Sequence, residues 1–126
     1  MLTVAYVFAA LAALVHVYIF WLEALAFTSA GRAAFGVSAE DAEIMKPWAY
    51  NQGFYNLFLA IGTGVGVAIA GQNRDASIAL VVFGIGSMIT AALVLITSDP
   101  AKARGAVVQG LFPALGLISL AIWAWA

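Results

Sequence analysis

The chain has no cysteine, a single histidine, and charged residues make up only 9% of its sequence. Without cysteine it forms no disulfide, no thiolate zinc site and no iron–sulfur cluster, and it uses no thiol nucleophile. One histidine and one carboxylate within the apolar stretches are too few ligands for a metal, so we expect neither a metal nor a cofactor. Five Lys and Arg residues form no basic cluster, which excludes nucleic acid as a partner.

Apolar sequence is what the chain does have: 65% of its residues are hydrophobic and the mean hydropathy is +1.05. A water-soluble domain of this size has too much surface to hide so large a fraction. The composition therefore predicts an integral membrane protein surrounded by membrane lipid.

Four apolar stretches are each long enough to cross about 30 Å of hydrocarbon as a helix. They cover residues of about 3–28, 48–70, 76–97 and 103–125. Asp99 and Pro100 precede the last stretch as an N-cap and a first-turn proline. We expect an all-α fold, in which a single transmembrane domain, 1–126, forms a four-helix bundle.

The longest loop, residues 29–47, holds more charged residues than any other loop of the chain. Within it Ser38 is followed three residues later by Asp41, the spacing of a helix capping box. This pattern predicts a short amphipathic helix over 39–46 in the first loop, ended before Pro47.

Basic residues in the loops indicate how the chain is oriented across the membrane. Arg74 stands alone in one loop, whereas the two loops on the other side contain Arg32, Lys46, Lys102 and Arg104. Because cytoplasmic loops carry an excess of Lys and Arg, we expect a multi-pass protein of the inner (plasma) membrane with both termini outside.

Polar residues of all four stretches fall at one depth. Glu23 lies roughly 7 Å inside the cytoplasmic boundary at a rise of ~1.5 Å per residue, and the cluster of residues 51–56 lies roughly 6–12 Å inside it. Gln109 falls in the same layer and Thr90 lies a little deeper. The candidate ligand-binding residues are Asn51, Gln52, Tyr55, Asn56, Gln109 and Thr90. The alternative is that these side chains mainly join helices to one another.

Glu23 and His16 are the candidate catalytic residues. An ionisable residue inside a span costs ~2.5–3.5 kcal/mol on insertion scales, so Glu23 must find a partner or stay protonated. His16 and Glu23 are seven residues apart, and in an ideal α-helix side chains at this spacing point in directions that differ by only about 20°. This spacing predicts His16 on the same face of the helix as Glu23, two turns deeper in the membrane. A structural hydrogen bond between helices is the alternative for this pair.

Several short motifs together resemble a known family. They are His16, Trp21-Leu22-Glu23, Phe35-Gly36, Asn51-Gln52-Gly53-Phe54-Tyr55-Asn56 and Gln109-Gly110-Leu111-Phe112-Pro113-Ala114. The pattern resembles the uncharacterised bacterial membrane family catalogued as domain of unknown function 1304, over nearly the whole chain. The resemblance implies a four-helix inner-membrane protein of about this length and brings no established activity, cofactor or substrate.

The sequence leaves three functions open, and with them whether the chain is an enzyme. In the first, a pocket binds a lipophilic small molecule and Glu23 and His16 transform it by proton transfer. In the second, a homodimer works as a proton-linked small transporter. The third is an accessory or structural membrane subunit. A pocket predicts a cavity within one protomer. A transporter predicts that the polar residues approach a subunit boundary or that a route continues past His16. An accessory subunit predicts no cavity and every amide paired.

Overall fold

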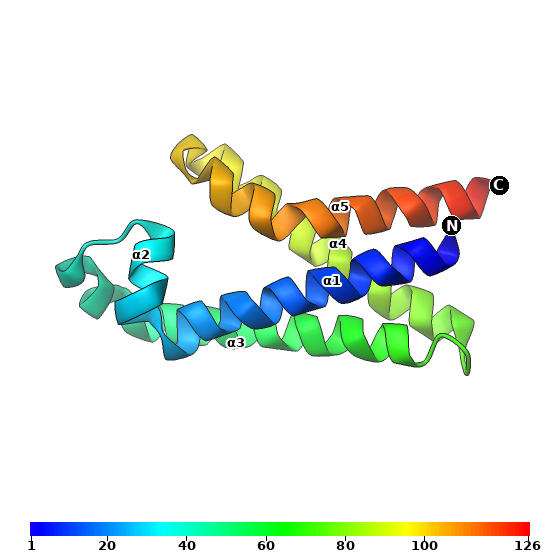
Figure 1. Cartoon of the computed structure of the whole chain (residues 1–126), viewed down its shortest axis with the longest axis horizontal. Helices are drawn as coiled ribbons and strands as arrows, with labels where there is room; N and C mark the ends of the chain where they lie inside the picture. The colour runs from blue at the N-terminus through cyan, green and yellow to red at the C-terminus, as the bar shows by residue number, and fades with distance from the viewer.

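The computed structural model describes all of residues 1–126, and it contains helices and no strand (Figure 1). The four long helices are α1 (Leu2–Phe20), α3 (Ala39–Ala68), α4 (Arg74–Ser98) and α5 (Ala103–Trp125). Shorter elements join them: the π-helical segments η1 (Trp21–Leu25) and η2 (Phe27–Gly31), the short helix α2 (Arg32–Phe35) and the 3-10 turn η3 (Pro100–Lys102). The predicted all-α class is confirmed.

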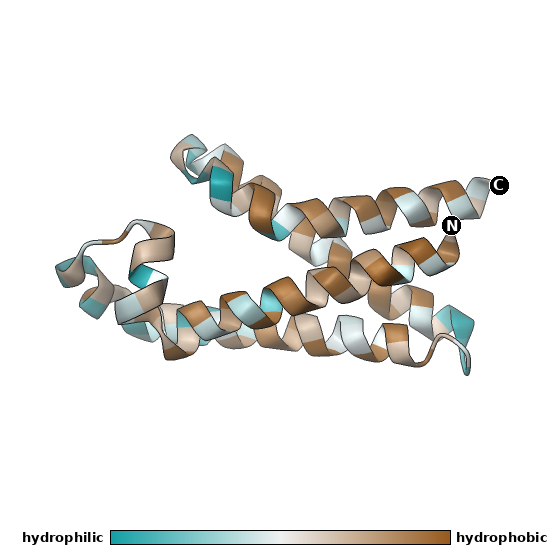
Figure 2. Ribbon diagram, in the orientation of Figure 1, coloured by the Kyte–Doolittle hydropathy of each residue, from teal (hydrophilic) through white to brown (hydrophobic).

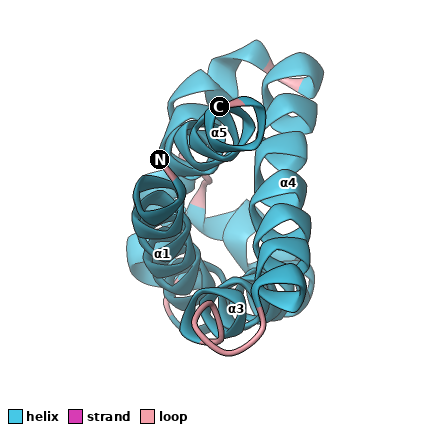
Figure 3. Cartoon of the chain, turned by 90° about the vertical axis from the view of Figure 1, so that its right-hand side faces the viewer, coloured by secondary structure: helices cyan, strands magenta, loops and turns pink.

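The long helices follow one another around a ring. α1 packs against α3 and α5, and α4 packs against the same two helices, whereas α1 and α4 make few contacts with each other. Figure 3 shows this order from the end at which both termini lie. The segments from η1 to α2, and η3, lie at the opposite end (Figure 1).

The core lies in the half of the ring near the termini. Small side chains recur on α1 every three or four residues, which puts them on one face and lets neighbouring helices approach closely. This face meets branched and longer side chains of α4 and α5. The core residues, none more than 6% exposed, are Ala5, Ala9, Ala12, Val81, Ile85, Met88 and Leu120.

The last two helices begin and end close to the predicted residues, and their starts are capped. Asp99 Oδ1 accepts a hydrogen bond from the Ala101 N–H at 3.1 Å, and Pro100 opens η3, as the sequence predicts. Asn73 caps α4 in the same way, accepting from the Ala76 N–H at 3.0 Å.

The first loop differs from its prediction at Pro47. Ser38 does cap a helix, since its Oγ accepts from the Asp41 N–H at 3.1 Å. That helix is α3, however, and it continues through Pro47, so the prediction of a separate short helix over 39–46 is wrong. Pro47 leaves the Glu43 carbonyl without its helical donor. Because this stretch is exposed, solvent can hydrate that carbonyl and the helix need not end.

Three helical segments are long and apolar enough to cross a membrane: Leu2–Leu25, Arg74–Ser98 and Pro100–Trp125. α3, which carries the amide cluster, is not among them, and a membrane span over 48–70 stays a prediction. Apolar residues dominate the long helices (Figure 2), and large side chains such as Phe83 and Leu14 are exposed on them.

Candidate functional site

A cavity of about 1030 Å³ opens at the end of the ring away from the termini. One wall runs from the last turn of α1 through η1 and α2 to residues 45–52 of α3. The other consists of the end of α4, η3 and the first turns of α5. In Figure 1 the pair α1 and α3 diverges from the pair α4 and α5 at this end. Most lining residues are apolar, and the charged and amide residues among them are Glu23, Asn51, Gln52, Lys102, Arg104 and Gln109.

Glu23 lies in a stretch where the backbone is π-helical. The Ala26 N–H donates to the Trp21 carbonyl at 2.9 Å, and the Gly31 N–H donates to the Ala26 carbonyl at 2.8 Å, both spanning five residues. Such turns contain one more residue than α-helical turns and occur frequently at functional sites. The ideal α-helical register that predicts His16 and Glu23 on one face therefore does not apply across this stretch.

The carboxylate of Glu23 has a partner on α3. Asn56, which is only 6% exposed, donates from Nδ2 to Glu23 Oε2 at 2.7 Å. Gly53, one turn earlier, permits the approach, because a Cβ at this position would lie 2.9 Å from the Ala24 backbone nitrogen. The glycine in the amide cluster thus allows α3 to pack closely against η1 and brings Asn56 to Glu23.

His16 lies apart from this pair. It is buried, and its Nδ1 is 2.9 Å from the Ala12 carbonyl on its own helix. The cavity reaches α1 at Tyr18 and Ile19, beyond His16 toward η1. The structure therefore does not bring His16 into the cavity with Glu23.

The remaining predicted ligand-binding residues divide into two groups. Asn51, Gln52 and Gln109 line the cavity. Tyr55 and Thr90 do not: Tyr55 is 59% exposed on the outside of α3, and the exposed Thr90 donates to the Gly86 carbonyl at 2.8 Å. Depth along a helix, on which the prediction rested, does not determine the side of the helix on which a residue lies.

The sequence analysis did not assign the residues at the mouth of the cavity to a site. Lys102 Nζ donates to the Phe35 carbonyl at 2.9 Å, which joins η3 to α2 across the opening. Arg104 lines the same mouth. Gly36 ends α2 in the left-handed conformation, with φ 66°, directly after Phe35. The excess of basic residues in the loops at this end is the sequence signal that points to Lys102 and Arg104.

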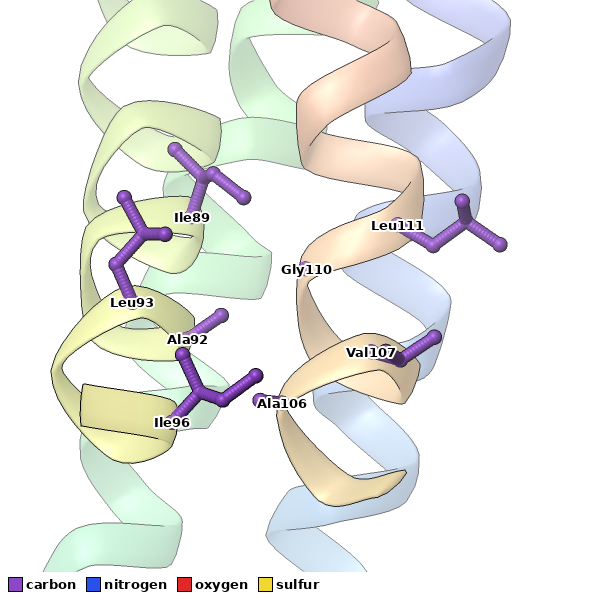
Figure 4. Close-up of a pocket in the computed structure, with 8 residues that line it drawn as sticks. All are labelled: Ile89, Ala92, Leu93, Ile96, Ala106, Val107, Gly110 and Leu111. Carbon is purple, nitrogen blue, oxygen red and sulfur yellow. The ribbon is translucent and has the colours of Figure 1, made fainter. Parts of the chain in front are cut away.

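A second, smaller hollow of about 230 Å³ lies between α4 and α5 (Figure 4). Apolar side chains of α4, among them Ile89, Leu93 and Ile96, line it opposite Gly110 of α5. It offers no charged or amide group that could orient a ligand, so the larger cavity is the candidate site.

The helices and the cavity define an all-α protein with long apolar helices and a polar group of side chains at one end. A family model described as a protein of unknown function (DUF1304) matches residues 10–121, and the chain belongs to this family. The matched residues include every residue that lines the larger cavity. No curated protein and no solved structure matches the chain.

Proposed function

We propose that the chain is a four-helix transmembrane bundle of the inner (plasma) membrane that binds a lipophilic small molecule in the cavity between its helix pairs. Three membrane-compatible helices support insertion, and α3 would be the fourth span because it completes the ring with them. The cavity end carries Arg32, Lys46, Lys102 and Arg104. By the excess of basic residues on the cytoplasmic side, the cavity faces the cytoplasm and both termini lie outside.

The observation that carries the proposal is that polar side chains of three helical segments line one cavity. Glu23 from η1, Gln52 from α3 and Gln109 from α5 all line it, although α3 and α5 are not neighbours in the ring. A mostly apolar cavity with a few converging polar groups is the usual form of a small-molecule site, and a volume of about 1000 Å³ admits a ligand of lipid size.

Proton transfer in this site would depend on Glu23. Its carboxyl group lines the cavity and holds a single side-chain partner, Asn56, so it can also reach a ligand. His16 is bonded within its own helix and supplies no second group. Binding is therefore the proposed function, and a chemical step would use Glu23 with the ligand.

A transporter route that continues past His16 has no observation in its favour. Such a route would have to cross the core, where residues of α1 and α4 pack without exposure. Cavity lining on α1 ends at Tyr18 and Ile19.

Filling the cavity tests the proposal. Gly105 lines the cavity, and a Cβ there would meet only Leu95 Cδ2 at 3.7 Å, an ordinary contact, so Gly105→Phe would project a ring into the space. Gly64→Phe is the matched control, since nothing lies within 4 Å of a Cβ at that exposed position. The three proteins are purified in a mild detergent, checked by circular dichroism, and extracted for mass spectrometry.

The wild type and Gly64→Phe should retain a lipophilic molecule after purification. The amount of this molecule per protein should be at least tenfold lower in Gly105→Phe. Equal contents in the three preparations, including none in any of them, would contradict binding in this cavity.

A further inference from the structure

The charges that line the cavity are unequal in number and position. Lys102 and Arg104 are cationic, and Glu23 is the only acidic residue in the lining. The carboxylate of Glu23 already accepts a hydrogen bond from Asn56 at 2.7 Å and belongs to the opposite wall. A ligand entering from the α5 side therefore first meets positive charge.

Apolar surface lies behind these cations. From Arg104 to Gln109 the helix rises roughly 7–8 Å, at ~1.5 Å per residue. Val108 lines the cavity between them, and Leu22 and Phe27 line the facing wall. The site thus presents cations at the mouth and, further in on α5, an apolar side chain next to an amide.

Both cations have donors to offer. Lys102 uses one N–H for the Phe35 carbonyl, and an ammonium group has three. Arg104 is exposed at the mouth, and a guanidinium can bind a carboxylate or a phosphate with two parallel hydrogen bonds.

We propose that the ligand is an anionic amphiphile, whose carboxylate or phosphate head pairs with Lys102 and Arg104 while its acyl chain lies against the apolar lining of the cavity. This inference rests on the proposed function, because it requires that the cavity bind a lipophilic molecule. A cationic amphiphile is repelled at the mouth, and a neutral one leaves the charged donors without a partner.

Oleate and its neutral methyl ester form the matched pair of probes, since they share the chain and differ in the charge of the head. Binding is measured by native mass spectrometry on the protein in non-ionic detergent, away from the anionic heads of a bilayer. We expect the wild type to bind oleate at least tenfold more tightly than methyl oleate. Oleyl phosphate distinguishes a preference for phosphate from one for carboxylate, and acetate and inorganic phosphate, which have no chain, should not bind.

Two variants and a control locate the effect. Arg104→Gln leaves the Lys102 contact with Phe35 intact, and Lys102→Gln with Arg104→Gln removes both cations. Each should lower the affinity for oleate, the double variant at least tenfold, with methyl oleate unchanged. Arg32→Gln with Lys46→Gln removes the same charge from the same end of the molecule, at residues that do not line the cavity, and should bind oleate as the wild type does.

The outcomes separate this inference from the proposed function. If oleate and methyl oleate bind equally, both weakened by Gly105→Phe and neither by loss of the cations, the cavity binds lipophilic molecules without selecting an anion and the inference is wrong. The inference also fails if acetate or inorganic phosphate binds as tightly as oleate. If no probe binds the wild type, or Gly105→Phe binds them equally well, the proposed function fails and the inference with it.

Discussion

The two ends of the ring of helices treat polar side chains differently. Near the termini, Ser77 Oγ donates to the Gly66 carbonyl at 2.6 Å and is hydrogen-bonded to Tyr6 Oη at 2.9 Å. At the other end Gln52 and Gln109 border a cavity of about 1030 Å³. The first end uses its polar groups to join helices. The second end also has such a link, from Asn56 to Glu23, but its glutamines border open space.

Helix α1 and its continuation belong to both ends and explain the difference. Its regular part places alanines on one face, and these are fully buried in the core together with side chains of α4 and α5. From Trp21 onward the backbone becomes π-helical, and the chain turns away into η2 and α2. The closely packed core and the cavity thus lie in different halves of the ring.

The largest expected effect compares the same substitution at the two ends. Met88 is fully buried in the core, whereas Met45 lines the cavity and is 44% exposed. Met88→Ala should lower the free energy of unfolding by about 2–5 kcal/mol, because it leaves a void among packed side chains. Met45→Ala should change it by less than about 0.5 kcal/mol. Unfolding in mixed micelles, followed by circular dichroism, measures both, and equal losses would remove the distinction between the halves.

A second comparison concerns two glycines of α3. Gly53→Ala would place a Cβ 2.9 Å from Ala24 and push α3 away from η1, at a cost of about 1–3 kcal/mol in the free energy of unfolding. Gly64→Ala meets nothing within 4 Å. There the better helix propensity of alanine should stabilise the protein by up to about 1 kcal/mol. The same unfolding assay measures the free energy of unfolding of both variants. A stabilised Gly53→Ala protein would contradict the close approach of α3 to η1.

The sequence predicts those features of the fold that depend on neighbouring residues. The caps at Ser38 and Asp99 were found because each contacts a backbone N–H two or three residues away. The family membership and the helical class follow from composition and motifs. The prediction that a helix ends before Pro47 is wrong, because proline breaks a helix less readily where solvent can hydrate the carbonyl that loses its donor. The exposure of this stretch is not visible in the local sequence.

The candidate site could be predicted only in part, because it depends on packing between distant segments. The sequence points to Glu23 and the amides because an ionisable or amide side chain inside an apolar stretch costs free energy unless it has a partner. The π-helical turns around Glu23 accompany the close approach of Gly53 to Ala24, 29 positions earlier in the chain. The Lys102 contact with Phe35 joins residues 67 positions apart, for which the sequence holds no signal.

A third prediction measures the link between η1 and α3. In a double-mutant cycle with Glu23→Ala and Asn56→Ala, the coupling energy should be about 0.6 kcal/mol, the average of such cycles in a helical membrane protein, and no more than about 1.7 kcal/mol. Glu23→Gln should keep the fold, because its amide oxygen can still accept from Asn56. Unfolding free energies of the single and double variants supply the cycle, and a coupling near zero would mean that the 2.7 Å contact does not hold the wall of the cavity.

The smallest expected effect concerns the mouth of the cavity. Lys102→Ala removes the hydrogen bond to the Phe35 carbonyl, which should cost about 0.5–1 kcal/mol. Because this bond joins η3 to α2 at the open end, the loss should appear as faster amide hydrogen exchange at Val37 and Ser38, with the exchange of the α1 and α4 core unchanged. Lys46→Ala, at an exposed position outside the cavity, is the control. Faster exchange in the core as well would show that the two halves unfold together, and the independence inferred from their packing would have to be abandoned.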